Sequence, residues 1–168
     1  HRVALTVCCG DPASVDGVLL EILDAEISTH LATVEQWLGD VVDHGLRADE
    51  SLLRAMHTIN GAFAMTEVPE ITEVTLPAEG YVKRLLAADL PASDAGVAAI
   101  AQTADAVRRA LAALHEAQPR IPVFADLAAR VAALRDSLPV PAARSIDVAD
   151  DEEPAPVPAT DAFVDGLP

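Results

Sequence analysis

Residues 52–67, LLRAMHTINGAFAMTE, carry the clearest helical signal of the chain. Their large apolar side chains recur at spacings of four, three and four residues, at Leu52, Met56, Ile59 and Phe63. This spacing predicts an amphipathic helix whose apolar face packs against neighbouring helices. His57 follows Met56 by one residue, about 100° around the helix. We therefore expect its imidazole at the exposed edge of the buried face.

Asn60 and Gly61 follow His57 by three and four residues, the spacings that place residues on one surface of a helix. Glycine costs about 1 kcal/mol relative to alanine inside a helix, so its presence indicates a need for space. A neutral imidazole is a nucleophile, and a bare turn beside it would let a phosphoryl-bearing site of another protein approach. The alternative is an ordinary surface histidine, which the spacing alone does not exclude.

The run HTINGA, residues 57–62, resembles the H-T-L-K-G-S/A signature of histidine-phosphotransfer (Hpt) domains. The longer runs HTINGAFAMTEVPEI and EGYVKRLL are similar to those of CheA-type chemosensory hybrid histidine kinases of the type IV pilus (Chp/Pil) class. The resemblance covers residues 15–90 and, more loosely, the helices out to Leu138. It departs from the family at Asn60, where a lysine usually stands.

The resemblance implies an Hpt module of a two-component phosphorelay. His57 would accept a phosphoryl group and exchange it with an aspartate of a response-regulator receiver domain, in a chemotaxis-like pathway that controls type IV pili and twitching motility. Gly61 would provide access, and Asn60 would offer the phosphoryl group a neutral hydrogen bond. A lysine donor would be charge-assisted and therefore stronger, so Asn60→Lys is expected to speed phosphorylation severalfold.

The same resemblance assigns the ATP-binding kinase domain and the metal ion to the parent chain or to a partner. The fragment itself would then be a phosphoacceptor, without a cofactor or a metal of its own, and not an independent enzyme. The runner-up interpretation is a degenerate Hpt-like docking or scaffold domain that is never phosphorylated. A plain helical spacer in a large signalling protein is a third.

Composition limits the partners of the chain. Residues are 51% hydrophobic but only 3% aromatic, and alanine supplies much of the hydrophobic share, which favours closely packed helices. The net charge of −16 and the absence of a Lys/Arg cluster argue against nucleic acid and anionic membranes as partners. Cys8 and Cys9 are adjacent and offer neither a disulfide framework nor a metal-ligand pattern. No apolar run is long enough to span a bilayer, so a cytoplasmic location is expected.

Helical signals recur along the chain, and we expect five helices. The first runs from an N-cap at Asp16 to about Val42. The second contains His57 and is capped by Asp49 or Ser51.

The third helix is predicted to begin at residues 68–70, with Thr66 near its cap. Pro77 and Gly80 are expected to interrupt and kink it, because a proline inside a helix removes one backbone hydrogen bond. Glu79 lies in the EGYVKRLL run, and no catalytic role is predicted for it.

The fourth helix is expected to start at a cap formed by Ser93 or Asp94 and to end before Pro119. His115 lies near its C-terminal end, where we expect a capping role. A shorter fifth helix covers residues 124–138.

These elements predict an all-α fold. Residues 16–138 should form an Hpt-like antiparallel four-helix bundle with an additional helix packed on its side or end. Residues 1–15 form an N-terminal lead-in of undetermined structure. Residues 139–168 are acidic and rich in proline and alanine, which predicts a disordered linker.

Overall fold

The computed structural model describes residues 17–66 and 68–141, and within these ranges it contains helices and no strands. The helices are α1 (Gly17–Asp40), α2 (Glu50–Ala64), α3 (Pro69–Ala88), α4 (Asp94–Leu114) and α5 (Ala125–Asp136). The predicted all-α class is confirmed. The expected cap at Asp16, the N-terminal lead-in and the acidic segment from residue 142 onward lie outside the described residues.

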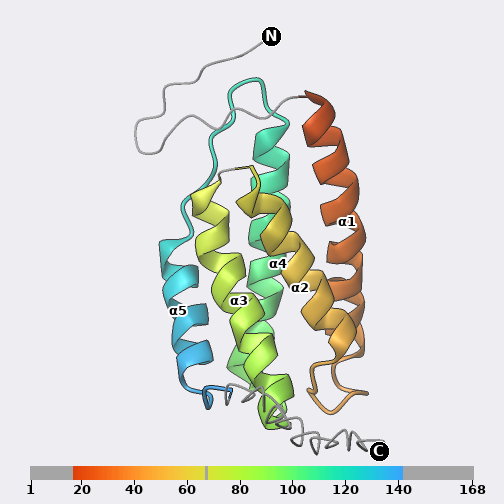
Figure 1. The fold of residues 1–168 in the computed structure, drawn as a ribbon, viewed down its shortest axis with the longest axis vertical. Coiled ribbons are helices and arrows are strands. Elements are labelled where there is room, and N and C mark those ends of the chain that lie inside the picture. The colour runs from red at the N-terminus through yellow and green to blue at the C-terminus, as the bar shows by residue number, and fades with distance from the viewer. Residues whose placement is uncertain (1–16, 67, 142–168) are drawn as a thin grey trace, which may run out of the picture.

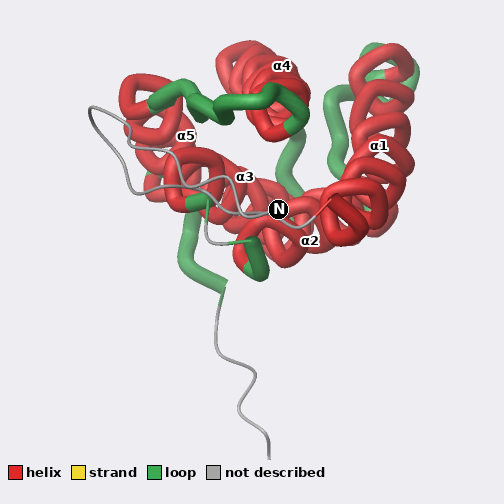
Figure 2. Tube along the Cα trace, turned by 90° about the horizontal axis from the view of Figure 1, so that it is seen from above, coloured by secondary structure: helices red, strands yellow, loops and turns green. Residues whose placement is uncertain are grey.

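Helices α1 to α4 run alternately down and up, as an antiparallel bundle requires (Figure 1). Each helix packs against the next along the chain, and α4 also packs against α1, so the four close into a ring. The additional helix α5 lies against α3 and α4 on the side away from α1, as the view along the bundle shows (Figure 2). None of the described helices is long and apolar enough to cross a bilayer.

The core is built from the apolar faces that the periodicity predicts. All four apolar residues of the predicted α2 face are buried: Leu52, Met56, Ile59 and Phe63. Trp37 of α1 is also buried, and its Nε1–H donates to the carbonyl oxygen of Arg47 over 2.9 Å. The indole thus fixes the loop between α1 and α2 to the end of α1.

Side-chain caps begin two of the helices at the predicted residues. Asp49 accepts a hydrogen bond from the backbone N–H of Leu52 over 2.7 Å at the start of α2. Ser93 accepts one from Gly96 over 3.0 Å at the start of α4. Each cap pairs one backbone donor that the first helical turn leaves without a partner.

Thr66 does not cap α3 as predicted. Its hydroxyl donates to the carbonyl oxygen of Phe63 over 2.8 Å and so belongs to the end of α2. The N-cap of α3 is Val68, which makes no side-chain capping bond. Pro69 at the first position makes a cap less necessary, because proline has no N–H to satisfy there.

The predicted interruption of α3 is wrong. The helix is continuous from Pro69 to Ala88 with Pro77 inside it. Proline removes only one backbone donor, and the residues on both sides of it, such as Val74 and Val82, are buried in the same core. Packing on both halves keeps the helix in one piece.

Helix α5 is attached to α3 through its C-terminal end. The Arg84 guanidinium donates to the carbonyl oxygens of Arg135 and Leu138, over 2.9 and 3.4 Å, at and just beyond the end of α5. A Cβ at Gly80 would lie 2.8 Å from Cδ of Arg135, so glycine permits the close approach. The hydrogen bond from Arg135 to the exposed Asp136 carboxylate lowers the pKa of that group.

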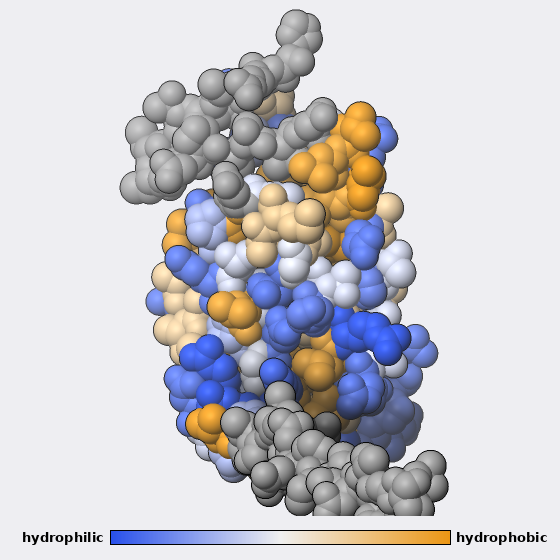
Figure 3. All heavy atoms as spheres, viewed as in Figure 1, coloured by the Kyte–Doolittle hydropathy of each residue, from blue (hydrophilic) through white to orange (hydrophobic). Residues whose placement is uncertain are grey.

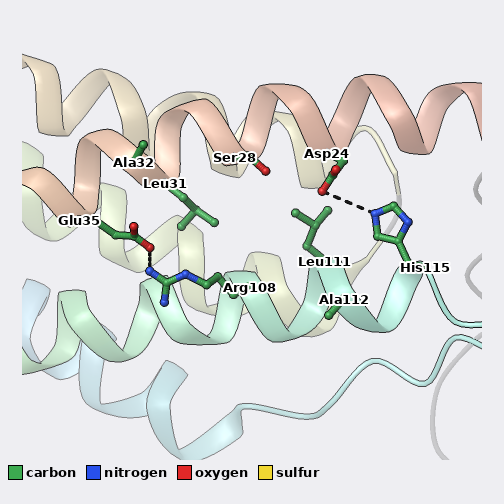
Figure 4. Close-up of a pocket in the computed structure, with 9 residues that line it drawn as sticks. All are labelled: Asp24, Ser28, Leu31, Ala32, Glu35, Arg108, Leu111, Ala112 and His115. Carbon is green, nitrogen blue, oxygen red and sulfur yellow. Dashed lines mark ion pairs between the residues drawn. The ribbon is translucent and has the colours of Figure 1, made fainter.

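Between α1 and α4 lies a shallow groove of about 500 Å³ (Figure 4). Leu31 and Leu111 project into it from the two helices. Glu35 and Arg108 form an ion pair across one end, and His115 faces Asp24 across the other, with 3.5 Å between Nε2 and Oδ1. The His115 side chain, predicted to cap α4, therefore contacts α1, and only its backbone N–H closes the last turn of α4.

Candidate functional site

His57 projects from the middle of α2 toward solvent. Its side chain is 73% exposed, whereas Met56 and Ile59 beside it are buried. The buried face of α2 holds the helix in a fixed rotation, so the exposed position of His57 follows directly from the apolar spacing. On the face that carries α2 and α3, hydrophilic residues alternate with smaller apolar patches (Figure 3). The prediction of an exposed imidazole at the edge of the buried face is confirmed.

The imidazole of His57 is held by a carboxylate from α3. Its Nδ1 lies 2.6 Å from Oε1 of Glu79, whose side chain is only 18% exposed. A carboxylate accepts hydrogen bonds and does not donate them, so Nδ1 carries the proton in the neutral ring. The lone pair then lies on Nε2, the ring nitrogen that Glu79 does not engage.

Asn60 holds the carboxylate of Glu79 in place, and Thr75 in turn holds Asn60. Asn60 donates from Nδ2 to Oε2 of Glu79 over 3.3 Å. The Oδ1 atom of Asn60 accepts a hydrogen bond of 2.8 Å from the hydroxyl of Thr75, a residue with 0% exposure on α3. His57, Glu79, Asn60 and Thr75 therefore form one hydrogen-bonded network between α2 and α3.

The family model that matches the chain is described as an Hpt domain, and the match spans residues 18–137. The chain belongs to the Hpt domain family. Such domains take part in histidine phosphotransfer within phosphorelays and interact with response-regulator receiver domains. No curated protein and no solved structure matches the chain.

The helical turn beside His57 is open in this Hpt domain, as the sequence predicted. A Cβ built at Gly61 would meet no other atom within 4 Å. Packing among the described residues therefore does not require a glycine at this position, although glycine lowers the helix propensity of α2.

Sequence reasoning placed His57, Asn60 and Gly61 on one surface, and the structure adds Glu79 and Thr75 from α3. The spacing of four residues between Thr75 and Glu79 shows that they share a face of α3. It does not show that this face meets α2 at the height of His57. The sequence did contain a signal for this part of the site, the Glu79 carboxylate within the EGYVKRLL run, but no catalytic role was predicted for it.

The partners of Asn60 differ from those expected. The sequence suggested that its amide would be available to a phosphoryl group, whereas in the structure Oδ1 and one N–H of Nδ2 are bonded within the domain.

Within residues 17–66 and 68–141, no group of three or more His, Cys, Asp and Glu side chains is arranged to hold a metal ion.

Proposed function

We propose that His57 is the phosphoacceptor of this Hpt domain. The observation that carries the proposal is the bond of 2.6 Å between Nδ1 and Glu79, which leaves Nε2 with the lone pair on an exposed ring. His30 and His115 face carboxylates through Nε2 instead, at 3.7 and 3.5 Å. Among the described histidines, His57 is the one whose Nδ1 is held by a carboxylate.

In the proposed reaction, the Nε2 lone pair attacks the phosphorus of ATP or of a phosphorylated aspartate. The N–P bond forms while the bond from phosphorus to the leaving oxygen breaks, and that oxygen departs with the electron pair. Nδ1 keeps its proton, and the Glu79 carboxylate stabilises the positive charge that develops on the ring. Return transfer to an aspartate of a receiver reverses these steps. The domain itself contributes orientation and electrostatics.

We further propose that the module belongs to a CheA-type kinase of the type IV pilus class and works in the cytoplasm with an ATP-binding kinase domain and a receiver. The support is the resemblance of the runs HTINGAFAMTEVPEI and EGYVKRLL. Two residues of the second run have clear structural uses here, because Glu79 binds His57 and Gly80 makes room for α5.

The test is phosphorylation of His57→Gln by a phosphorylated receiver or a CheA-type kinase. We expect the acid-labile phosphoryl label to disappear, because glutamine has no nucleophilic nitrogen. The circular-dichroism spectrum and the free energy of unfolding should change little, by about 0.5 kcal/mol or less, because the side chain is exposed. His44→Gln, which alters an exposed histidine in the turn after α1, should label normally.

Undiminished labelling of His57→Gln would show that the phosphoacceptor is another residue. A wild-type domain that binds a receiver but takes no label from any kinase or receiver would favour the alternative function, a docking domain that is never phosphorylated. The replacement of the usual family lysine by Asn60 is the observation that makes this alternative worth testing.

A further inference from the structure

The hydroxyl of Thr75 donates to a residue on another helix, which is unusual for a threonine inside a helix. Threonine hydroxyls inside helices can return to a backbone carbonyl three or four residues earlier. Thr29, Thr72 and Thr103 do so in this domain. Thr75, with 0% exposure, instead directs its hydroxyl across to Asn60 on α2, over 2.8 Å. A buried hydroxyl that leaves its own helix for the phosphoacceptor network indicates a role in that network.

In each hydrogen bond of the network, the neighbouring bond determines which group donates and which group accepts. Because the Glu79 carboxylate only accepts, the group that Asn60 turns toward it is the NH₂. The Asn60 carbonyl oxygen consequently faces Thr75, and the Thr75 hydroxyl donates to it. With Oε2 bonded to Asn60, Oε1 is the atom that receives Nδ1–H of His57.

We infer that Thr75 is a positioning residue for His57. Through Asn60 and Glu79 it fixes which imidazole nitrogen carries the proton, and so keeps the lone pair on Nε2. The role of Thr75 in phosphotransfer rests on the function proposed above. The effect on the tautomer of His57 can be measured without any phosphotransfer.

The test compares Thr75→Val with Thr75→Ser. Valine has nearly the shape of threonine but cannot donate, so Asn60 loses its donor and Glu79 loses its fixed orientation. Loss of one such bond corresponds to about 1 kcal/mol, or roughly fivefold in rate. We expect His57 phosphorylation to slow about fivefold in Thr75→Val and to return to within about twofold of wild type in Thr75→Ser.

Thr103→Val is the matched control, because Thr103 is also buried, lies in α4, and donates to the carbonyl oxygen of Ala99 over 2.8 Å. It should label at the wild-type rate. The tautomer of His57 is measured separately from two-bond ¹H–¹⁵N correlations of the ring at a pH where it is neutral. We expect the Nδ1–H form to dominate in wild type and its share to fall in Thr75→Val alone.

An unchanged tautomer ratio in Thr75→Val would overturn the inference, even if the rate fell. Equal slowing of Thr75→Val and Thr75→Ser would also overturn it, because the hydroxyl would then be irrelevant. A tautomer shift in Thr75→Val, in a domain that no kinase or receiver labels, would support the positioning role while refuting the proposed function.

Discussion

The role of Asn60 inferred from the sequence differs from the one that its contacts in the structure indicate. Three residues after His57, it occupies the position where the family usually has a lysine, and from the sequence it looked like a weak substitute for a cation. In the structure its amide joins Glu79 of α3 to Thr75 and thereby supports the carboxylate that binds His57. Asparagine suits this place because it donates and accepts at once.

The expectation for Asn60→Lys therefore reverses. A lysine has three donors and no acceptor, so the buried Thr75 hydroxyl would lose its partner, at a cost of about 1–3 kcal/mol. The ammonium would also pair with the Glu79 carboxylate and compete with His57 for it. We expect a lower melting temperature and severalfold slower phosphorylation, measured by label incorporation at low salt.

Ala101→Lys is the control for added charge, since it places the same cation on the exposed face of α4. It should leave the rate unchanged. Faster labelling of Asn60→Lys than of wild type would mean that a cation near the phosphoryl group matters more than the network that holds Glu79.

Helix α2 combines a buried face that anchors it with an exposed face that it leaves partly bare. Gly61 lies in its interior, one turn after His57, and a Cβ there would touch nothing. Helix α2 thus has lower helix propensity one turn after His57, the proposed phosphoacceptor. This is expected where a partner must come close.

Gly61→Ala should therefore stabilise the free domain and impair its exchange with a receiver. We expect a gain of about 0.5–1 kcal/mol in the free energy of unfolding, since alanine restricts the unfolded chain and favours the helix. Phosphotransfer to the receiver should slow, because the added methyl group occupies the approach to His57. Thermal melts and receiver phosphotransfer rates measure the two effects.

Gly39→Ala is the matched control, because Gly39 lies within α1 and its Cβ would also meet no atom within 4 Å. It should raise stability, or leave it unchanged, without slowing transfer. Wild-type transfer by Gly61→Ala would show that the bare turn is not needed for docking.

For the molecule as a whole, α5 and the acidic segment after it are predicted to differ in their contribution to stability. Leu127 and Val131 of α5 are buried, and Arg84 of α3 donates to the carbonyl oxygen of Arg135 near the end of α5. The acidic linker, residues 139–168, was predicted from its composition to bury little apolar surface. We therefore expect truncation after Pro141 to leave the melting curve unchanged.

A longer truncation, after Arg120, removes α5 as well. It should lower the melting temperature by several degrees or more, because burial of each large apolar side chain contributes about 1.5–3 kcal/mol. If the shorter truncation also lowered the melting temperature, the acidic segment would have to pack on the bundle, contrary to its composition.

Local sequence was sufficient to predict the helices and the exposure of His57. The spacing of Leu52, Met56, Ile59 and Phe63 defines a buried face, and its geometry places His57 at the edge of that face. Capping residues such as Asp49 were recognisable because their bonds reach only three residues along the chain. Such features depend on neighbours in sequence, so they can be inferred without knowing how helices meet.

The bond between His57 and Glu79 joins residues 22 positions apart and could not be inferred in the same way. Periodicity gives the face on which Glu79 lies, but the packing of α3 against α2 determines which residues of the two helices stand at the same height. The continuity of α3 through Pro77 likewise depends on burial of both halves in one core. These features arise from side-chain packing between helices, which no single stretch of the chain contains.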